Sequence, residues 1–265
     1  MILKHTSQSS KMMQSNDHLK NALMLEVAHA KAIATSDPIH KKHAFDCANS
    51  FRECNRHEDA IRWYKTILKQ ENSPQEKYLS CFYMYKCYVE IGQREHGIFH
   101  LVKSFAYDIE RVECLYELVE HYCCEKMSNV AYTYYNIVKP HYIKSINDSS
   151  ITNSKLHFNS NVSNFFLPYY MIIVADHVND RACGVFMYDV IFRNKPRVFS
   201  EWHLNNLFFN LRFFISHVSS EFVSIANEYL LFLVKNGVNS KIFKQIANSF
   251  EYGGVSFPNS LCIDV

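Results

Sequence analysis

The feature of this sequence that most constrains its fold is a spacing of small, aromatic and aliphatic residues that recurs along the chain. With Ala48 as offset zero, the pattern has members at offsets 3, 12, 16 and 19, and the member at offset 12 is small. Further copies begin at Tyr85, Val119 and Ile172, at intervals of 37, 34 and 53 residues. The members after offset zero are Phe51, Ala60, Tyr64 and Ile67; Tyr88, Gly97, Leu101 and Ser104; Tyr122, Ala131, Tyr135 and Val138; and Ala175, Gly184, Tyr188 and Ile191. Such a spacing predicts a stack of similar units.

Each copy predicts a pair of antiparallel helices. A small residue at offset 12 lets the second helix approach the first closely, and the larger members fill the space around them. Helix starts are marked by Ser73-Pro74-Gln75-Glu76 and by Asn55, which precedes Glu58 in a capping-box arrangement. Glycine and proline number only six each, and strand-like alternation is not convincing before residue 250. The sequence therefore predicts an all-α fold.

These offsets resemble those of tetratricopeptide repeats (TPR), which are helix-turn-helix units of about 34 residues. The runs EDAIRWYKTILK and IERVECLYELVEHYCCEK are similar to the TPR-like segment associated with glycosyltransferases of bacteria and large DNA viruses. The resemblance covers roughly residues 40–215. It implies an α-solenoid of about four TPR-like units with capping helices, and a connection to sugar transfer. The chain has room for this helical segment but not for a glycosyltransferase fold beside it, so the implied role in sugar transfer is accessory or belongs to a part that is not present in this sequence.

The resemblance and the helix signals together divide the chain into seven expected segments. A helix is expected near the N-terminus, with an apolar stripe made of Leu23, Leu25, Val27, Ala30 and Ile33. The expected segments are a flexible N-terminus (1–16), a capping helix (17–40), three TPR-like units (41–142), a polar insertion (143–164), a fourth unit (165–195), C-terminal helices (196–250) and a tail (251–265).

The candidate binding residues lie on the first helix of each pair, because these helices line the concave face of such an array. The position three residues before offset zero is aromatic in every copy, and the position one residue after it is mostly polar. The residues are Phe45, Phe82, Tyr116 and Tyr169 in the aromatic row, and Asn49, Lys86 and Glu120 in the polar row. Aromatic rings beside polar groups suit an extended peptide or a sugar chain. The alternative is that the rings pack against the next unit.

Signals for catalysis, cofactors and metals are weak. His96 and His100 have helical i,i+4 spacing but lack the glutamate of a zinc protease motif. The Cys114, His121, Cys123 and Cys124 group contains adjacent cysteines, which point about 100° apart on a helix. The charged residues Asp176, His177, Asp180 and Arg181 are typical of a helix end, and the sequence contains no D-x-D. We expect no catalytic residue, cofactor or metal.

The chemical balance of the chain predicts a cytoplasmic protein with reduced cysteines. The formal charge is only +2, which gives no indication of nucleic acid as a partner. The apolar run 165–175 is too short to span a membrane. Nine cysteines occur without a C-x-x-C spacing. The expected partner is a protein or peptide, with a glycosyltransferase or its acceptor among the candidates.

Three functions are consistent with this sequence. The first is a protein-interaction scaffold with a concave helical groove, accessory to a glycosyltransferase. The second is part of a glycosyltransferase that transfers sugar from a nucleotide-sugar donor. The third is a self-assembling structural protein that uses exposed aromatic residues such as Trp202 and Phe208.

Overall fold

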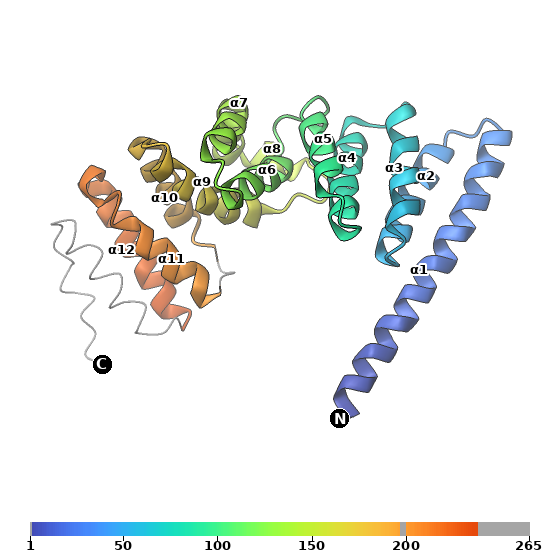
Figure 1. Cartoon of the computed structure of the whole chain (residues 1–265), viewed down its shortest axis with the longest axis horizontal. Coiled ribbons are helices and arrows are strands. Elements are labelled where there is room, and N and C mark those ends of the chain that lie inside the picture. The colour runs from blue at the N-terminus through green and yellow to red at the C-terminus, as the bar shows by residue number, and fades with distance from the viewer. Residues whose placement is uncertain (1, 197–199, 238–265) are drawn as a thin grey trace. The chain divides into compact units, whose positions relative to one another are not determined.

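The protein has an all-α helical-repeat fold, as the sequence predicts, and a computed structural model describes residues 2–196 and 200–237, with side chains from residue 14 onward. The described residues form helices and connecting turns, without a strand among them (Figure 1). The chain separates into two compact halves, an N-terminal half up to Ile109 and a C-terminal half from Glu110.

The N-terminal half contains five helices that follow one another as antiparallel neighbours. Each helix packs on the next, and α2 also packs on α4. These contacts place the first helices of successive pairs side by side. The helices are α1 (Ile2–Ala34), α2 (His40–Glu53), α3 (His57–Lys69), α4 (Pro74–Glu90) and α5 (Arg94–Ser104).

The C-terminal half repeats this arrangement with two further pairs, in which α6 packs on α7 and α9 packs on α10. The first helices α6 and α9 again contact each other, and α10 and α9 contact the later helices α12 and α11. The elements are α6 (Glu113–Cys124), α7 (Ser128–Asn147), α8 (Ser149–Asn153), the π-helical turn η1 (Val162–Phe166), α9 (Leu167–His177), α10 (Arg181–Asn194), α11 (Glu201–Leu211), the 3-10 turn η2 (Ile215–His217) and α12 (Ser220–Lys235).

One turn geometry joins the two helices of every pair. The residue at offset 7 is left-handed in all four pairs, with φ values of 61°, 72°, 60° and 60° at Asn55, Gly92, Lys126 and Asn179. The amide at offset 8 donates to the carbonyl at offset 3, as from Met127 N to Tyr122 O at 2.8 Å. This 6→1 bond satisfies a carbonyl that the helix end would otherwise leave free. The repeat register therefore continues through the insertion into the fourth pair.

The shared turn corrects the interpretation of Asn55 as a helix start. Asn55 follows the end of α2 in the left-handed conformation, which asparagine tolerates better than most residues. Helix α3 begins after Arg56 without a side-chain cap. At Ser73 the prediction is confirmed, because its hydroxyl accepts from the Glu76 amide and the Glu76 carboxylate accepts from the Ser73 amide.

The repeat positions form the core of each half. All members at offsets 0, 12, 16 and 19 are buried. The two glycines at offset 12 lie against bulky side chains. A Cβ atom at Gly97 would lie 2.9 Å from Tyr85 Cδ2 of the first helix in its pair, and one at Gly184 would overlap the ring of Phe214, which follows α11. At Gly97 the small residue therefore allows the close approach of the two helices of the pair, and at Gly184 it makes room for a side chain from outside the pair.

Two of the expected segment boundaries differ in the structure. Helix α1 begins at Ile2, so residues 2–16 continue the helix instead of forming a flexible end. Its buried positions are Ala22, His29 and Ala32, whereas Leu23, Val27 and Ile33 of the expected apolar stripe are exposed. Helix α7 extends into the expected insertion as far as Asn147. The helix expected at 240–250 and the tail lie outside the described residues.

The remainder of the insertion is tied to the start of α6. The guanidinium of Arg111, which is 1% exposed, makes two hydrogen bonds to the Glu113 carboxylate at 2.6 and 3.2 Å. It also donates to the carbonyl oxygen of Leu156 at 2.7 Å. Glu110 pairs with Lys155 at 3.2 Å. These bonds connect the segment before α9 to the frame of the C-terminal half.

Candidate functional site

A half-exposed group of aromatic side chains lies on the C-terminal half, and we call it the aromatic surface. Its members come from α6, η1, α9 and α11, and each ring contacts at least one other ring of the group. The ring of Tyr116 lies 5.9 Å from Phe166 and 6.0 Å from Tyr170, centroid to centroid. The His203 ring lies 6.1 Å from Phe166 and 5.0 Å from Trp202. The aromatic surface consists of Tyr116, Glu120, Phe166, Tyr170, Trp202 and His203.

The local sequence explains how these side chains are presented. Phe166 ends the π-helical turn that leads into α9, and such turns often occur at functional sites. Ser200 caps α11 by accepting from the His203 amide. Its hydroxyl also hydrogen-bonds the His203 ring at 2.8 Å. The cap therefore fixes the first turn of α11, where Trp202 is 61% exposed.

Glu120 gives the aromatic surface a negative charge. The hydroxyl of Tyr170 donates to Glu120 Oε1 at 3.0 Å, and Tyr116 forms a second side-chain hydrogen bond with the same carboxylate. Burial and the negative charges of Glu120 and Glu117 raise the pKa of Tyr116. Burial and the charge of Glu120 likewise raise the pKa of Tyr170. Both phenols therefore stay protonated and hold the carboxylate in place.

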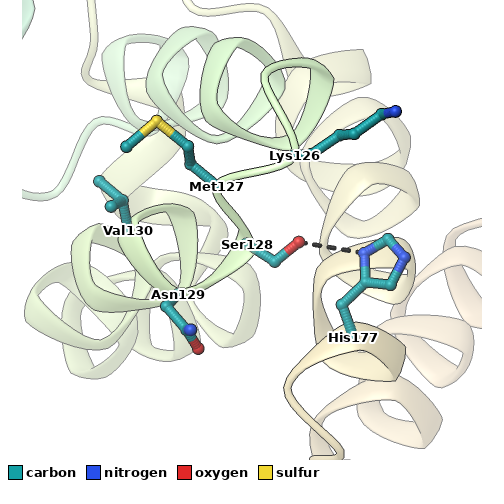
Figure 2. Close-up of a pocket in the computed structure, with 6 residues that line it drawn as sticks. All are labelled: Lys126, Met127, Ser128, Asn129, Val130 and His177. Atoms are coloured by element: carbon teal, nitrogen blue, oxygen red, sulfur yellow. Dashed lines mark hydrogen bonds between the residues drawn. The ribbon is translucent and has the colours of Figure 1, made fainter.

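A separate pocket of about 550 Å³ lies at the beginning of α7 (Figure 2). Ser128 and His177 face each other across it, and the Ser128 hydroxyl and His177 Nδ1 share a hydrogen bond of 3.0 Å. The pocket is lined by Lys126, Met127, Ser128, Asn129, Val130 and His177. It therefore joins the turn between α6 and α7 to the end of α9.

A serine–histidine hydrogen bond is also one part of a hydrolase triad, which needs an exposed serine and an acid that orients the histidine. Ser128 is only 9% exposed. The two nearby acids are engaged elsewhere, since Asp176 pairs with Arg181 and Asp180 accepts from Tyr132. Asp180 also caps α10 by accepting from the Cys183 amide. The charged residues around His177 are therefore engaged in an ion pair, a hydrogen bond and a helix cap. We assign no catalytic role to Ser128 and His177.

The candidate residues of the N-terminal half lie close together on α2 and α4. The amide oxygen of Asn49 accepts from the Tyr64 hydroxyl at 2.8 Å. Lys86 Nζ lies 5.5 Å from the centroid of Phe82, and the Phe82 ring lies 5.5 Å from that of Tyr83. The guanidinium of Arg52 stacks on Tyr83 at 3.9 Å. Tyr64 is buried, whereas Phe82, Tyr83, Lys86, Arg52 and Asn49 are partly exposed. This face therefore combines aromatic rings with positive charge.

The structure divides the seven predicted binding residues into two groups. Phe45 and Tyr169 are 8% and 3% exposed, because they pack against Tyr64 and against Trp202 and His203 respectively. Both rings are therefore packed inside the fold, Phe45 against the second helix of its own pair and Tyr169 against α11, which follows the fourth pair. The partly exposed residues are Asn49, Phe82, Lys86, Tyr116 and Glu120. For these five, binding stays a prediction.

The residues that sequence reasoning missed are Phe166, Tyr170 and His203. Tyr170 directly follows Tyr169, which the repeat pattern predicts as a binding residue. Because the pattern assigns one aromatic position to each first helix, it does not include Tyr170. Of the two residues named for self-association, Trp202 is exposed and Phe208 is fully buried. The exposed neighbour is Phe209, at 50%.

The structure shows the surroundings of the histidines and cysteines that the sequence analysis considers as metal ligands. His100 is buried and stacks on Tyr88 with centroids 5.7 Å apart. Within residues 2–196 and 200–237, no group of three or more His, Cys, Asp and Glu side chains could hold a metal ion. The eight described cysteines are free thiols, and burial raises the pKa of Cys47, Cys81 and Cys87 to about 12.

No protein-family model matches this sequence, and a search of curated proteins finds no match. The described helices include none with the length and apolar character needed to cross a membrane.

Proposed function

We propose that this chain is a protein-interaction module, in which a rigid frame of helical pairs presents the aromatic surface to a partner protein. The observation that carries this proposal is a series of half-exposed or exposed rings in mutual contact, from Tyr170 and Tyr116 through Phe166 and His203 to Trp202, with the Glu120 carboxylate hydrogen-bonded to Tyr170 at one end. Aromatic side chains contribute large contact areas at low entropic cost and dominate the binding energy of many interfaces.

The charge of the surface indicates the kind of segment it would bind. The carboxylate of Glu120 accepts from the Tyr170 hydroxyl at one end of the group of rings. A cation is attracted both by a carboxylate and by the face of an aromatic ring. A peptide segment with apolar residues and a lysine or arginine would therefore fit. In keeping with the resemblance to TPR-like segments, the proposed partner is a glycosyltransferase or its acceptor protein.

The proposal is tested by affinity capture from host cells with Glu120→Lys. This change reverses the charge beside Tyr170 in the aromatic surface. The matched control is Glu125→Lys, which makes the same change at an exposed site one residue past the end of α6. We expect wild type and Glu125→Lys to recover the same partner, and Glu120→Lys to lose it while its circular dichroism is unchanged.

The same experiment can contradict the proposal. If folded Glu120→Lys recovers the same partners as wild type, the aromatic surface is not the binding site. If no partner is recovered and the molar mass rises with protein concentration in light scattering, the self-assembling alternative is supported instead. Identification of a glycosyltransferase among the captured proteins would support the accessory role.

A further inference from the structure

A second exposed surface lies farther along the C-terminal half, at the end of α11. Phe209 and Phe213 are 50% and 40% exposed, and their rings meet edge to face with centroids 6.4 Å apart. The guanidinium carbon of Arg212 lies 3.6 Å from the centroid of Phe209 and 4.6 Å from that of Phe213. We call these three residues the Arg212 cluster.

Arg212 differs from the other described arginines of this half in having no acidic partner. Arg111 pairs with Glu113, Arg181 with Asp176, and Arg193 with Asp189 and Glu221. Nothing in residues 2–196 and 200–237 forms a hydrogen bond or ion pair with Arg212, and its Nε atom is buried without a hydrogen-bond partner. Among the described residues the cluster therefore contains a cation held against two rings, and none of them forms a hydrogen bond with its guanidinium.

The stacking geometry favours one chemical group as the ligand. A guanidinium that lies over a ring uses its flat face, and its N–H groups point outward in the plane. A carboxylate accepts two such N–H groups in parallel, and this bidentate pair is among the strong hydrogen bonds of proteins. The two rings also limit the movement of Arg212, so less side-chain entropy is lost when a ligand binds.

We propose that the Arg212 cluster is a docking site for a protein segment that carries an aspartate or glutamate flanked by apolar residues. The carboxylate pairs with Arg212, and the apolar neighbours cover Phe209 and Phe213. Arginine and aromatic residues together are the types most enriched at the energetic centres of interfaces. This site is separate from the aromatic surface, and the sign of its charge is opposite.

The test is selection of a displayed random peptide library against the full chain, followed by synthesis of the best binder and of its Glu→Gln or Asp→Asn counterpart. We expect the selected peptides to be enriched in acidic residues, and the amide counterpart to bind about tenfold or more weakly. Arg212→Gln should weaken binding of the acidic peptide by a similar factor. Arg193→Gln is the matched control, because it removes an exposed arginine that already has acidic partners, and it should bind as wild type.

Two further variants keep the outcome decisive. Arg212→Lys keeps the charge but loses the bidentate geometry, and we expect binding intermediate between wild type and Arg212→Gln. Glu120→Lys should leave binding of the acidic peptide intact, which separates this site from the aromatic surface. The proposal is overturned if the selected peptides show no acidic preference, if the amide counterpart binds equally, or if folded Arg212→Gln binds as wild type.

Discussion

The buried histidine of α5 predicts a measurable dependence of stability on pH. His100 is 9% exposed, stacks on Tyr88, and has a buried Nδ1 without a hydrogen-bond partner within the described part of the chain. Burial, together with the positive charges of Lys65 and Lys103, lowers the pKa of His100 to about 4, from 6.5 for an unperturbed histidine. Protonation of this ring is therefore unfavourable in the folded protein.

The sign and size of the effect follow from these two pKa values. Above pH 6.5 the ring is neutral in both states, and His100 does not change stability with pH. As the pH falls below 6.5 the unfolded chain takes up a proton at His100, whereas the folded chain does not until about pH 4. The free energy of unfolding should therefore fall by about 2 kcal/mol by pH 5, and by about 3 kcal/mol in total.

The assay is urea unfolding followed by circular dichroism at pH 7.5 and pH 5. Wild type should lose about 2 kcal/mol more stability between the two values than His100→Gln, which cannot titrate. His96→Gln is the matched control, because His96 also stacks on Tyr88 but is exposed, and it should keep the wild-type dependence. If His100→Gln loses as much stability as wild type, protonation of His100 does not destabilise the fold.

Two glycines give further predictions about the helical pairs, measured by the same urea unfolding at pH 7.5. Gly184→Ala should destabilise the protein, because the new methyl group would overlap Phe214; overpacking of about 1–3 kcal/mol exceeds the gain of about 1 kcal/mol in helix propensity. The cost should shrink in a Phe214→Leu background, and an equal cost in both backgrounds would exclude the overlap as its cause. Gly92→Ala should cost about 1–2 kcal/mol through backbone strain alone, since φ is 72° and a Cβ would meet nothing within 4 Å. An unchanged midpoint would show that the turn adjusts its backbone to alanine.

The frame could be predicted from the sequence because close helix packing restricts residue size at regular positions. Gly97 stands where a methyl group would clash with Tyr85 of the preceding helix, so the small residue at offset 12 indicates the pairing directly there. The prediction of a helix start at Asn55 is wrong because asparagine favours two positions: the residue before a helix and the left-handed residue after one.

The candidate site was only partly predictable, because exposure depends on neighbours outside the repeat. Tyr116 and Tyr169 occupy equivalent positions, yet Tyr169 is covered by the first turn of α11, which belongs to none of the four pairs. The exposed side of α1 shows the same difficulty, because periodic apolar residues do not reveal which side of a helix has a neighbour. Whether a predicted aromatic ring is exposed therefore depends on contacts with helices, such as α11, that do not belong to the repeated pairs.

The turn at offset 7 has a consequence for where this chain can change length. In all four pairs the same backbone bonds close the link between the two helices, although the residue there is asparagine, glycine or lysine. Between pairs the link ranges from the four residues after α3 to the much longer stretch before α9. Added residues between pairs can be accommodated outside the core, whereas one residue added inside a pair would rotate the second helix by about 100° and expose its buried side. The pair is thus the unit that could be moved, duplicated or replaced, and its turn is the part whose length must be kept.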